Sequence, residues 1–196
     1  MQPETTEAAP ALEVRPLTPE RWPDLEKLFG PGGAYGGCWC MWFRLRRKEF
    51  AQNSGKQNRQ AMKEIVDSGE PPGLLACVDG EPVGWVSLAP RDKFTHLERS
   101  RTFKRVDDQP VWSIVCFFVA KPYRGQGLME KLLEAAIRYA ADRGAKIVEG
   151  YPVEPGERLS GYSGYTGIVS TFRKAGFAEV LRRADRRPIM RYAIER

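Results

Sequence analysis

The sequence predicts a single α/β domain built on a mixed, mostly antiparallel sheet. Three observations favour this class. Residues 111–119 are rich in β-branched and aromatic side chains, which is typical of a strand buried on both faces. A glycine-containing turn then leads into an amphipathic helix, and another apolar strand follows at 146–153. Because a helix connects these two strands, they should lie parallel, whereas the strands joined by short turns should pair antiparallel.

The chain of 196 residues is long enough for one domain that buries most of its apolar surface. Residues 1–11 show no periodicity and should be a disordered lead-in, so the domain is expected to cover residues 12–196. We expect about seven strands, flanked by about four helices. The expected strands are 12–15, 73–78, 83–88, 111–119, 146–153, 177–182 and 189–194, and the expected helices are 18–29, 58–68, 128–144 and 165–175.

Two connections can be interpreted from their residue types. Asp79-Gly80 supplies the positive φ angles of a tight turn, so the strands at 73–78 and 83–88 should form a hairpin. The polar segment 90–109 is longer than a usual hairpin loop. It is either a flap over a binding site or a solvated insertion, and the sequence leaves both alternatives open.

The turn Arg124-Gly125-Gln126-Gly127 joins the central strand to the helix that begins at Leu128. The glycines let the backbone turn sharply, and the first amides of the helix have no partner inside it and lie at the positive end of its dipole. Such amides suit a diphosphate. The glycine pair alone also fits an ordinary strand-to-helix connection, but Arg124 and the buried strand favour an anion site.

This stretch resembles the GNAT superfamily of acyl-CoA-dependent N-acyltransferases, whose central motif reads Arg/Gln-x-x-Gly-x-Gly/Ala between a core strand and a helix. The matching residues are Arg124, Gly125, Gln126, Gly127, Leu128 and Met129, with Met129 in place of the final Gly or Ala. Residues 165–177 follow a second frame of the family, in which Phe172 occupies a tyrosine position. The resemblance covers about residues 12–194, and only the central motif is specific by residue.

The resemblance implies that the two central parallel strands splay apart and that the pantetheine arm of acetyl-CoA enters the gap between them. The backbone of Phe117, Phe118 and Val119 would pair with that arm. The diphosphate would lie on the turn at 124–129, and Phe172 would border the same cofactor site. No metal is expected.

Attack by an amine requires a base, because an alkyl ammonium has a pKa near ~10. Glu149 is the only carboxylate inside a predicted core strand, and a carboxylate there has either a raised pKa or a dedicated partner. Ser113 stands roughly where some members of the family carry a catalytic glutamate. Asp107 and Asp108, at the mouth of the strand, are candidates for relaying protons through water.

The departing thiolate also needs a proton. The family commonly uses the tyrosine of its last helix, and the phenyl ring of Phe172 cannot replace it. Tyr165 or Tyr162 is therefore a candidate acid, unless the thiolate takes its proton from solvent. Packing is the alternative role for each tyrosine.

Trp39 and Trp42 belong to an aromatic cluster beside a glycine-rich loop. In the GNAT architecture the first two helices and their connection form one wall of the acceptor site. By resemblance, Trp39 and Trp42 are candidates for lining that site, together with Trp85 in the strand 83–88. Packing of the same aromatic side chains in the core is the alternative.

Composition restricts the partners. The chain has 31 basic and 25 acidic residues, a net charge of +6, which favours anionic partners such as coenzyme A. The basic residues form no block of five, which disfavours nucleic acid. No apolar run approaches the ~20 residues that span a bilayer, and a secretory leader is not evident, so a cytoplasmic protein without membrane contact is expected.

The cysteines give no strong signal. Cys38 and Cys40 are too close in sequence for an ordinary bridge, while Cys77 and Cys116 lie in predicted strands. Buried free thiols are favoured over metal or redox chemistry. The single histidine, His96, excludes a histidine-rich metal site.

These observations favour an acetyl-CoA-dependent N-acetyltransferase in which the amine attacks directly, with a small-molecule amine favoured over a protein amine. The alternative is a GNAT fold that binds or senses acyl-CoA without turnover, because the usual acid and base are absent. The resemblance also allows a homodimer.

Overall fold

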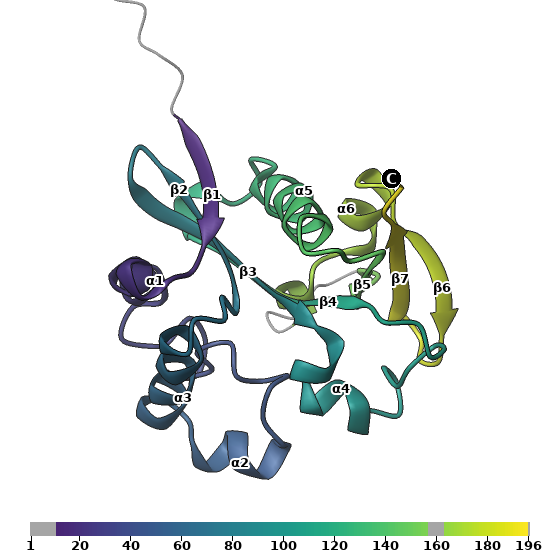
Figure 1. The fold of residues 1–196 in the computed structure, drawn as a ribbon, viewed down its shortest axis with the longest axis horizontal. Helices are drawn as coiled ribbons and strands as arrows, with labels where there is room; N and C mark the ends of the chain where they lie inside the picture. Colours follow the sequence, from purple (N-terminus) through teal and green to yellow (C-terminus); the bar gives the residue numbers. More distant parts are fainter. Residues whose placement is uncertain (1–10, 157–162, 196) are drawn as a thin grey trace, which may run out of the picture.

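The computed structural model describes residues 11–156 and 163–195. Its centre is a seven-stranded sheet with the order β1-β2-β3-β4-β5-β7-β6 (Figure 1). β4 and β5 are parallel, and the other neighbouring pairs are antiparallel. The strands are β1 (Leu12–Pro16), β2 (Gly73–Val78), β3 (Glu81–Pro90), β4 (Trp112–Val119), β5 (Ile147–Gly150), β6 (Ala178–Arg182) and β7 (Pro188–Ala193). The predicted α/β class and mixed sheet are confirmed.

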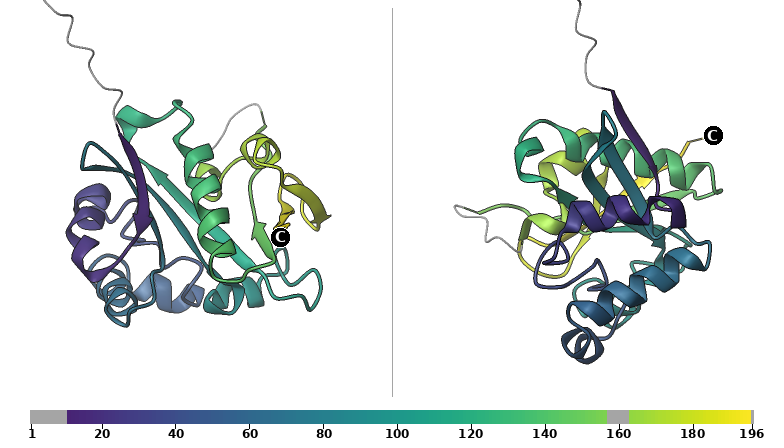
Figure 2. Two further views of the ribbon diagram at one scale, coloured as in Figure 1. Left: turned by 45° about the horizontal axis from the view of Figure 1, so that its top comes forward. Right: turned by 90° about the vertical axis from the view of Figure 1, so that its left-hand side faces the viewer.

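Helices cover both sides of the sheet, as the rotated views of Figure 2 show. α5 (Leu128–Ala141) and α6 (Val169–Lys174) pack on one face, where their apolar side chains join those of β2, β3 and β4 in the largest core cluster. The other face carries α1 (Trp22–Phe29), α2 (Arg47–Gln52), α3 (Lys56–Asp67) and α4 (Thr95–Arg99). Two further apolar clusters lie on that side, one around α1 and α3 and one beside α4.

Local sequence explains the connections that hold this sheet. Asp79 and Gly80 have φ angles of 50° and 83°, which gives the β2–β3 hairpin the expected tight turn. α5 ends as predicted by its glycine: Gly144 has a φ of 78°, and the Ala145 N–H donates to the Ala140 carbonyl at 3.0 Å. The turn sets the β2–β3 hairpin, and the cap ends the helix that covers the central strands.

β4 and β5 separate soon after they meet. They pair only over residues 112–114 of β4 and 148–150 of β5. Beyond Gly150 the chain leaves β4, and Val153 forms a parallel bridge with Ile168 instead. Residues 115–119 of β4 therefore have β3 as their only strand neighbour in the part of the chain that the structure describes. The splay that the resemblance implies is present.

A β-bulge lies at the point of separation. Ser87 pairs with Cys116 and Leu88 with Ile114, so Val115 is an extra residue on β4. Val115 belongs to the cluster beside α4, and Cys116 packs against the same cluster. The bulge thus turns two consecutive side chains toward the α4 side of the sheet.

The segment between β3 and β4 is neither structureless nor a solvated insertion. It contains a 3₁₀ turn (Arg91–Lys93) and α4, and it buries Phe94, Leu97 and Phe103. Scattered among polar neighbours, these three side chains show no clear periodicity in the sequence. With α2 and α4, the described residues contain six α-helices instead of about four. None of them is long and apolar enough to cross a bilayer.

Candidate active site

The loop before α5 has the geometry of an anion site. Gly125 and Gly127 have φ angles of 75° and 76°, values that a side chain would strain. The first amides that bond into the helix are those of Glu130 and Lys131, which donate to the Gly127 carbonyl. Within the described residues, the amides at positions 125–129 have no hydrogen-bond acceptor. A row of open amides therefore stands at the positive end of a 14-residue helix.

Side chains of the motif brace this loop. The Arg124 Nε donates to the Val119 carbonyl at 2.9 Å, and the Gln126 Nε2 donates to the Pro122 carbonyl at 2.7 Å. Both side chains are exposed. Leu128 is buried under the helix and Met129 is partly buried, so these two residues offer their amides and not their side chains to the surface. Arg124 thus links the loop directly to the end of β4.

The splayed part of β4 runs toward this loop. Phe117 points into the core under α5, where it contacts Phe172 edge-on at 6.1 Å between ring centroids. Phe172 is fully buried, and Gly150 and Gly167 leave room for its ring. Phe118 points to the opposite side of the sheet. The structure therefore places Phe172 in the core beneath the splay and Phe117 to Val119 along its open edge.

A cavity of about 500 Å³ lies on the α2 and α4 side of this edge. Its wall is mainly aromatic, with sulfur and cationic groups between the rings. The aromatic members are Tyr35, Trp42, Phe43, Phe50, Phe103, Phe118 and Tyr165, the sulfur members are Cys38, Cys40 and Cys116, and the basic residues are Arg47, His96 and Arg187. Val115 and Cys116 of the bulge form part of the wall, so the cavity opens onto the splay.

The segment after β3 supplies another part of the wall. His96, Ser100, Thr102 and Phe103 all line the cavity. The His96 N–H of the backbone donates to the Phe43 carbonyl at 3.0 Å, which ties α4 to the aromatic cluster. Of the two alternatives for residues 90–109, the structure favours a role at the site, as a packed wall.

His96 is a base that the sequence did not reveal. Its ring lies 5.7 Å from Trp42 and 5.5 Å from Phe43, measured between centroids. Burial, with Arg47 as a second cause, lowers the pKa of His96 below its usual 6.5. Neither ring nitrogen has a hydrogen-bond partner among the described residues. A neutral imidazole can therefore accept a proton in this cavity at neutral pH.

Tyr165 connects the cavity with the α5 loop. Its ring stacks on Phe118, with 6.5 Å between centroids and 5° between planes. Burial is the main cause that raises the pKa of Tyr165, Arg124 opposes it, and Cys38 and Cys116 add to it. Tyr165 thus stays protonated at neutral pH and lies within electrostatic range of both the loop and the thiols. Tyr162 falls outside the described residues.

The three thiols of the wall differ in their contacts, and Cys38 and Cys40 differ in the direction of their pKa shifts. Cys40 Sγ lies 3.6 Å from Cys116 Sγ. Hydrogen bonding from Cys40 is the largest cause that lowers the pKa of Cys38 to about 6, whereas burial raises the pKa of Cys40. All four cysteines are free, and no group of three metal-ligating side chains exists among the described residues.

Glu149 and Ser113 do not line the cavity; they belong to a closed network beside it, in which Arg91 bonds to Phe103 of the cavity wall. Glu149 is 1% exposed and accepts from Arg91 at 3.0 Å, from Arg191 at 2.8 Å and from the Tyr151 hydroxyl at 2.6 Å. The Ser113 hydroxyl meets the same Tyr151 oxygen at 2.8 Å. Both carboxylate oxygens of Glu149 are therefore engaged, which argues against its expected role as the base.

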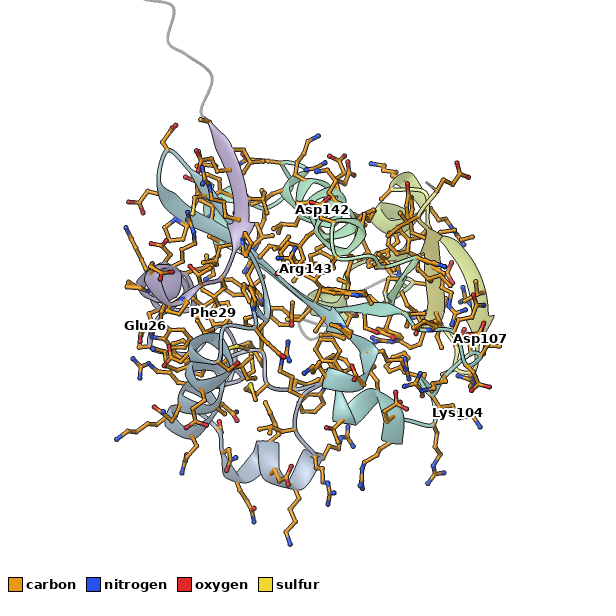
Figure 3. The ribbon with its side chains drawn as sticks, in the orientation of Figure 1. Glu26, Phe29, Lys104, Asp107, Asp142 and Arg143 are labelled. Atoms are coloured by element: carbon orange, nitrogen blue, oxygen red, sulfur yellow. The ribbon has the colours of Figure 1, made fainter. Side chains whose placement is uncertain are left out.

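Asp107 extends this network to the surface, where Figure 3 shows it at the edge of the molecule near the end of β6. Its carboxylate pairs with Arg191 at 2.7 Å and 3.0 Å, and this pairing is the main cause that lowers the pKa of Asp107 to about 2. Such an acid holds protons too weakly to relay them near neutral pH. The expected relay through Asp107 is therefore not supported by this geometry.

The three tryptophans proposed for the acceptor site have different environments. Trp42 is 38% exposed and lines the cavity. Trp39 is buried, stacks on Trp22 at 6.0 Å and borders a separate surface pocket near Arg59. Trp85 is fully buried in the α1 core cluster. Trp42 therefore has the position expected of a residue that lines the acceptor site, whereas Trp85 is a core residue.

Residues 39–156 match the family model described as the acetyltransferase (GNAT) family. The chain belongs to this family. An uncharacterized N-acetyltransferase from Archaeoglobus fulgidus is 28% identical to it over 102 residues. That match covers 52% of this chain and 63% of the relative, so the chain spans less than two thirds of that protein's length.

Solved structures of this GNAT family have the same fold. The PaiA N-acetyltransferase from Thermoplasma acidophilum, in complex with coenzyme A, matches with a TM-score of 0.54 and 14% identity over 94% of this chain and 99% of that one. A GNAT acetyltransferase from Listeria monocytogenes matches with a TM-score of 0.59 and 11% identity over 93% of this chain and 95% of that one. An aminoglycoside N-acetyltransferase in complex with CoA matches with a TM-score of 0.54 and 15% identity over 91% of this chain and 95% of that one.

Proposed function

We propose that the chain transfers an acetyl group from acetyl-CoA to a primary amine, a small molecule bound in the cavity, by direct attack of the amine. The observation that carries this proposal is one continuous arrangement: open amides before α5, a splayed edge of β4, and a cavity whose wall includes the β4 bulge. Membership of the GNAT acetyltransferase family supports it, as do the structural neighbours that hold coenzyme A.

The chain offers a fitting site for coenzyme A. The open amides at 125–129 would hold the diphosphate, and the positive φ angles of Gly125 and Gly127 leave that approach free of side chains. The edge of residues 117–119 would pair with the amides of the pantetheine arm. When bound, acetyl-CoA supplies a thioester that is activated toward an amine.

His96 and Tyr165 are the groups that we propose for proton transfer. An alkyl ammonium must lose a proton before it attacks, and the neutral imidazole of His96 faces the same cavity as the amine. Tyr165 keeps its proton at neutral pH and lies between the cavity and Arg124. It is therefore placed to protonate the departing thiolate. Their presence at the wall favours catalysis over a module that only senses acyl-CoA.

The test is a pair of glycine variants. Gly125 and Gly144 both have positive φ and open space around the Cα, so aspartate strains the backbone similarly at the two positions. Only Gly125→Asp places a carboxylate among the amides before α5. We expect Gly125→Asp to weaken CoA binding at least ~10-fold through repulsion, and Gly144→Asp to leave it unchanged. The measurement is thermal stabilisation by CoA, followed by thiol release from acetyl-CoA with a panel of amines.

The result that contradicts the proposal is also clear. Equal stabilisation by CoA in the Gly125→Asp and Gly144→Asp variants would remove the diphosphate site from this loop. Normal CoA binding with no thiol release over a broad amine panel would instead favour the sensing module.

A further inference from the structure

The charges on the cavity wall are unbalanced. Arg47 and Arg187 both line the cavity, and no aspartate or glutamate lines it among the described residues. Arg47 is exposed, with its guanidinium 5.6 Å from the Trp42 ring centroid. Neither arginine forms an ion pair with a carboxylate within the described part of the chain. The described wall therefore has two cationic side chains that no carboxylate pairs with.

Arg187 is the more informative of the two. It is half-buried, its guanidinium lies 4.9 Å from the Phe103 ring centroid, and its Nη2 donates to the Tyr151 carbonyl at 3.3 Å. Burial lowers its pKa below the usual value, and no carboxylate opposes that effect. A guanidinium that loses part of its hydration is stabilised by an anionic partner, because the lost hydration is otherwise uncompensated. Its remaining N–H groups can serve a ligand.

A second group on the same wall has no partner. The Thr166 side chain is 8% exposed, and its hydroxyl oxygen has no hydrogen bond among the described residues. Buried hydroxyl groups are usually paired, so an unpaired one that lines a cavity points to a missing ligand atom. Arg187 and Thr166 thus add two unsatisfied polar groups to a wall that is otherwise mainly aromatic.

We infer that the acceptor is an amine that also carries a carboxylate, which Arg187 binds while the aromatic side chains hold an apolar body. This inference rests on the proposed function. The planar guanidinium matches a carboxylate in shape and in its single charge. A polycationic acceptor would instead require acidic groups on the wall. Hydrogen bonding from Cys40, with backbone groups as further causes, lowers the pKa of the Cys38 thiol to about 6, and Arg187 is not among the causes.

The experiment compares acids with their neutral amides. The probes are benzoate, phenylacetate and 3-phenylpropionate, each paired with its amide, titrated by calorimetry into the protein saturated with CoA. The variants are Arg187→Gln, which keeps a donor for the Tyr151 carbonyl, and Arg173→Gln, an exposed arginine on α6 as the matched control. We expect at least one acid to bind fivefold or more tightly than its amide. Arg187→Gln should reduce that ratio at least fivefold, and Arg173→Gln should preserve it.

Two results overturn the inference. One is a ratio below fivefold for every pair, which includes the failure of all three acids to bind. The other is an acid preference that survives in Arg187→Gln. CoA saturation is measured first and separately, so a protein that binds CoA but shows no acid preference contradicts the carboxylate site alone. A protein that CoA does not stabilise contradicts the proposed function, and the acids are then titrated without CoA.

Discussion

Two polar regions lie next to each other on the α4 side of the sheet, and they differ in how their groups are satisfied. In the first region, beside the paired part of β4 and β5, Glu149 is held by Arg91, Arg191 and Tyr151, and each of its oxygens has a partner. In the cavity, the ring nitrogens of His96 and the Thr166 hydroxyl have no partner within the described residues. The first region is closed and the second is open.

This difference indicates a structural role for the closed network and a role in substrate binding or proton transfer for the open groups. A buried carboxylate between two guanidiniums is committed to that geometry, because releasing it would leave charges without compensation. All three nitrogens of Arg91 have partners: Nε donates to Glu98, Nη1 to Glu149 and Nη2 to the Phe103 carbonyl. The closed network thus holds the wall segment 91–103 in place, while the open groups remain available to a substrate. Mutations should affect the two regions in different measurements.

The largest effect should come from the closed network. Glu149→Ala leaves Arg91 and Arg191 without their shared counter-charge, and breaking a buried pair in this way costs about 3–5 kcal/mol. We expect that loss in the free energy of unfolding from urea denaturation. Glu13→Ala is the control, because Glu13 is in an exposed pair with Arg15 and should cost less than about 1 kcal/mol. Equal losses in the two variants would contradict the network's role.

His96→Gln should leave stability nearly unchanged and reduce turnover. We expect kcat to fall about 100-fold, the lower range for a lost general base, while CoA affinity stays the same. The direction in which kcat changes with pH follows from the protonation of His96. Protonation of His96 fills the nitrogen that must accept the amine proton, so kcat falls as the pH falls through its pKa. Because that pKa is lowered, the midpoint of the fall lies below 6.5.

The contrary result for His96 is a profile that does not change. If the acid limb of kcat persists in His96→Gln with the same midpoint, another group titrates there and the imidazole is not the base.

Tyr165→Phe should have a smaller effect. It removes the hydroxyl but keeps the ring that stacks on Phe118, and solvent at the open cavity can supply the proton in its place. We expect kcat to fall about tenfold with unchanged CoA binding. Steady-state rates at neutral pH measure this effect. A loss of CoA affinity at constant kcat would show that Tyr165 positions the coenzyme and does not donate the proton.

Ser113→Ala should have the smallest effect. The Ser113 hydroxyl is one of several groups on the Tyr151 oxygen, so its removal should cost about 1 kcal/mol in the free energy of unfolding. Turnover should stay within about twofold, because Ser113 does not reach the cavity wall. A fall in kcat above tenfold at unchanged stability would return Ser113 to the catalytic site.

Local patterns made the fold and the coenzyme loop predictable. Asp79-Gly80 specifies its turn through the φ angles that it allows, and the glycines before Leu128 specify theirs, so both features depend on a few neighbouring residues. The central strand was evident because both of its faces are apolar.

The chemistry of the cavity depends on contacts between distant segments, and the sequence did not show them. Arg91 and Glu149 are 58 positions apart, and Glu149 therefore looked like a base without its partners. His96 had no recognisable motif, because its position depends on the packing of Phe94 and Leu97 within a polar segment. One signal was available: a single histidine beside buried aromatic residues is a candidate base in a family that needs one.

We propose that coenzyme A lies on the amides before α5 with its sulfur at the splay of β4 and β5. A crystal structure with CoA bound tests it most directly. We predict diphosphate oxygens within about 2.7–3.2 Å of amide nitrogens at 125–129, and the sulfur at the mouth of the cavity between Tyr165 and the β4 bulge. A diphosphate bound elsewhere, or a sulfur that points away from this cavity, would contradict the account.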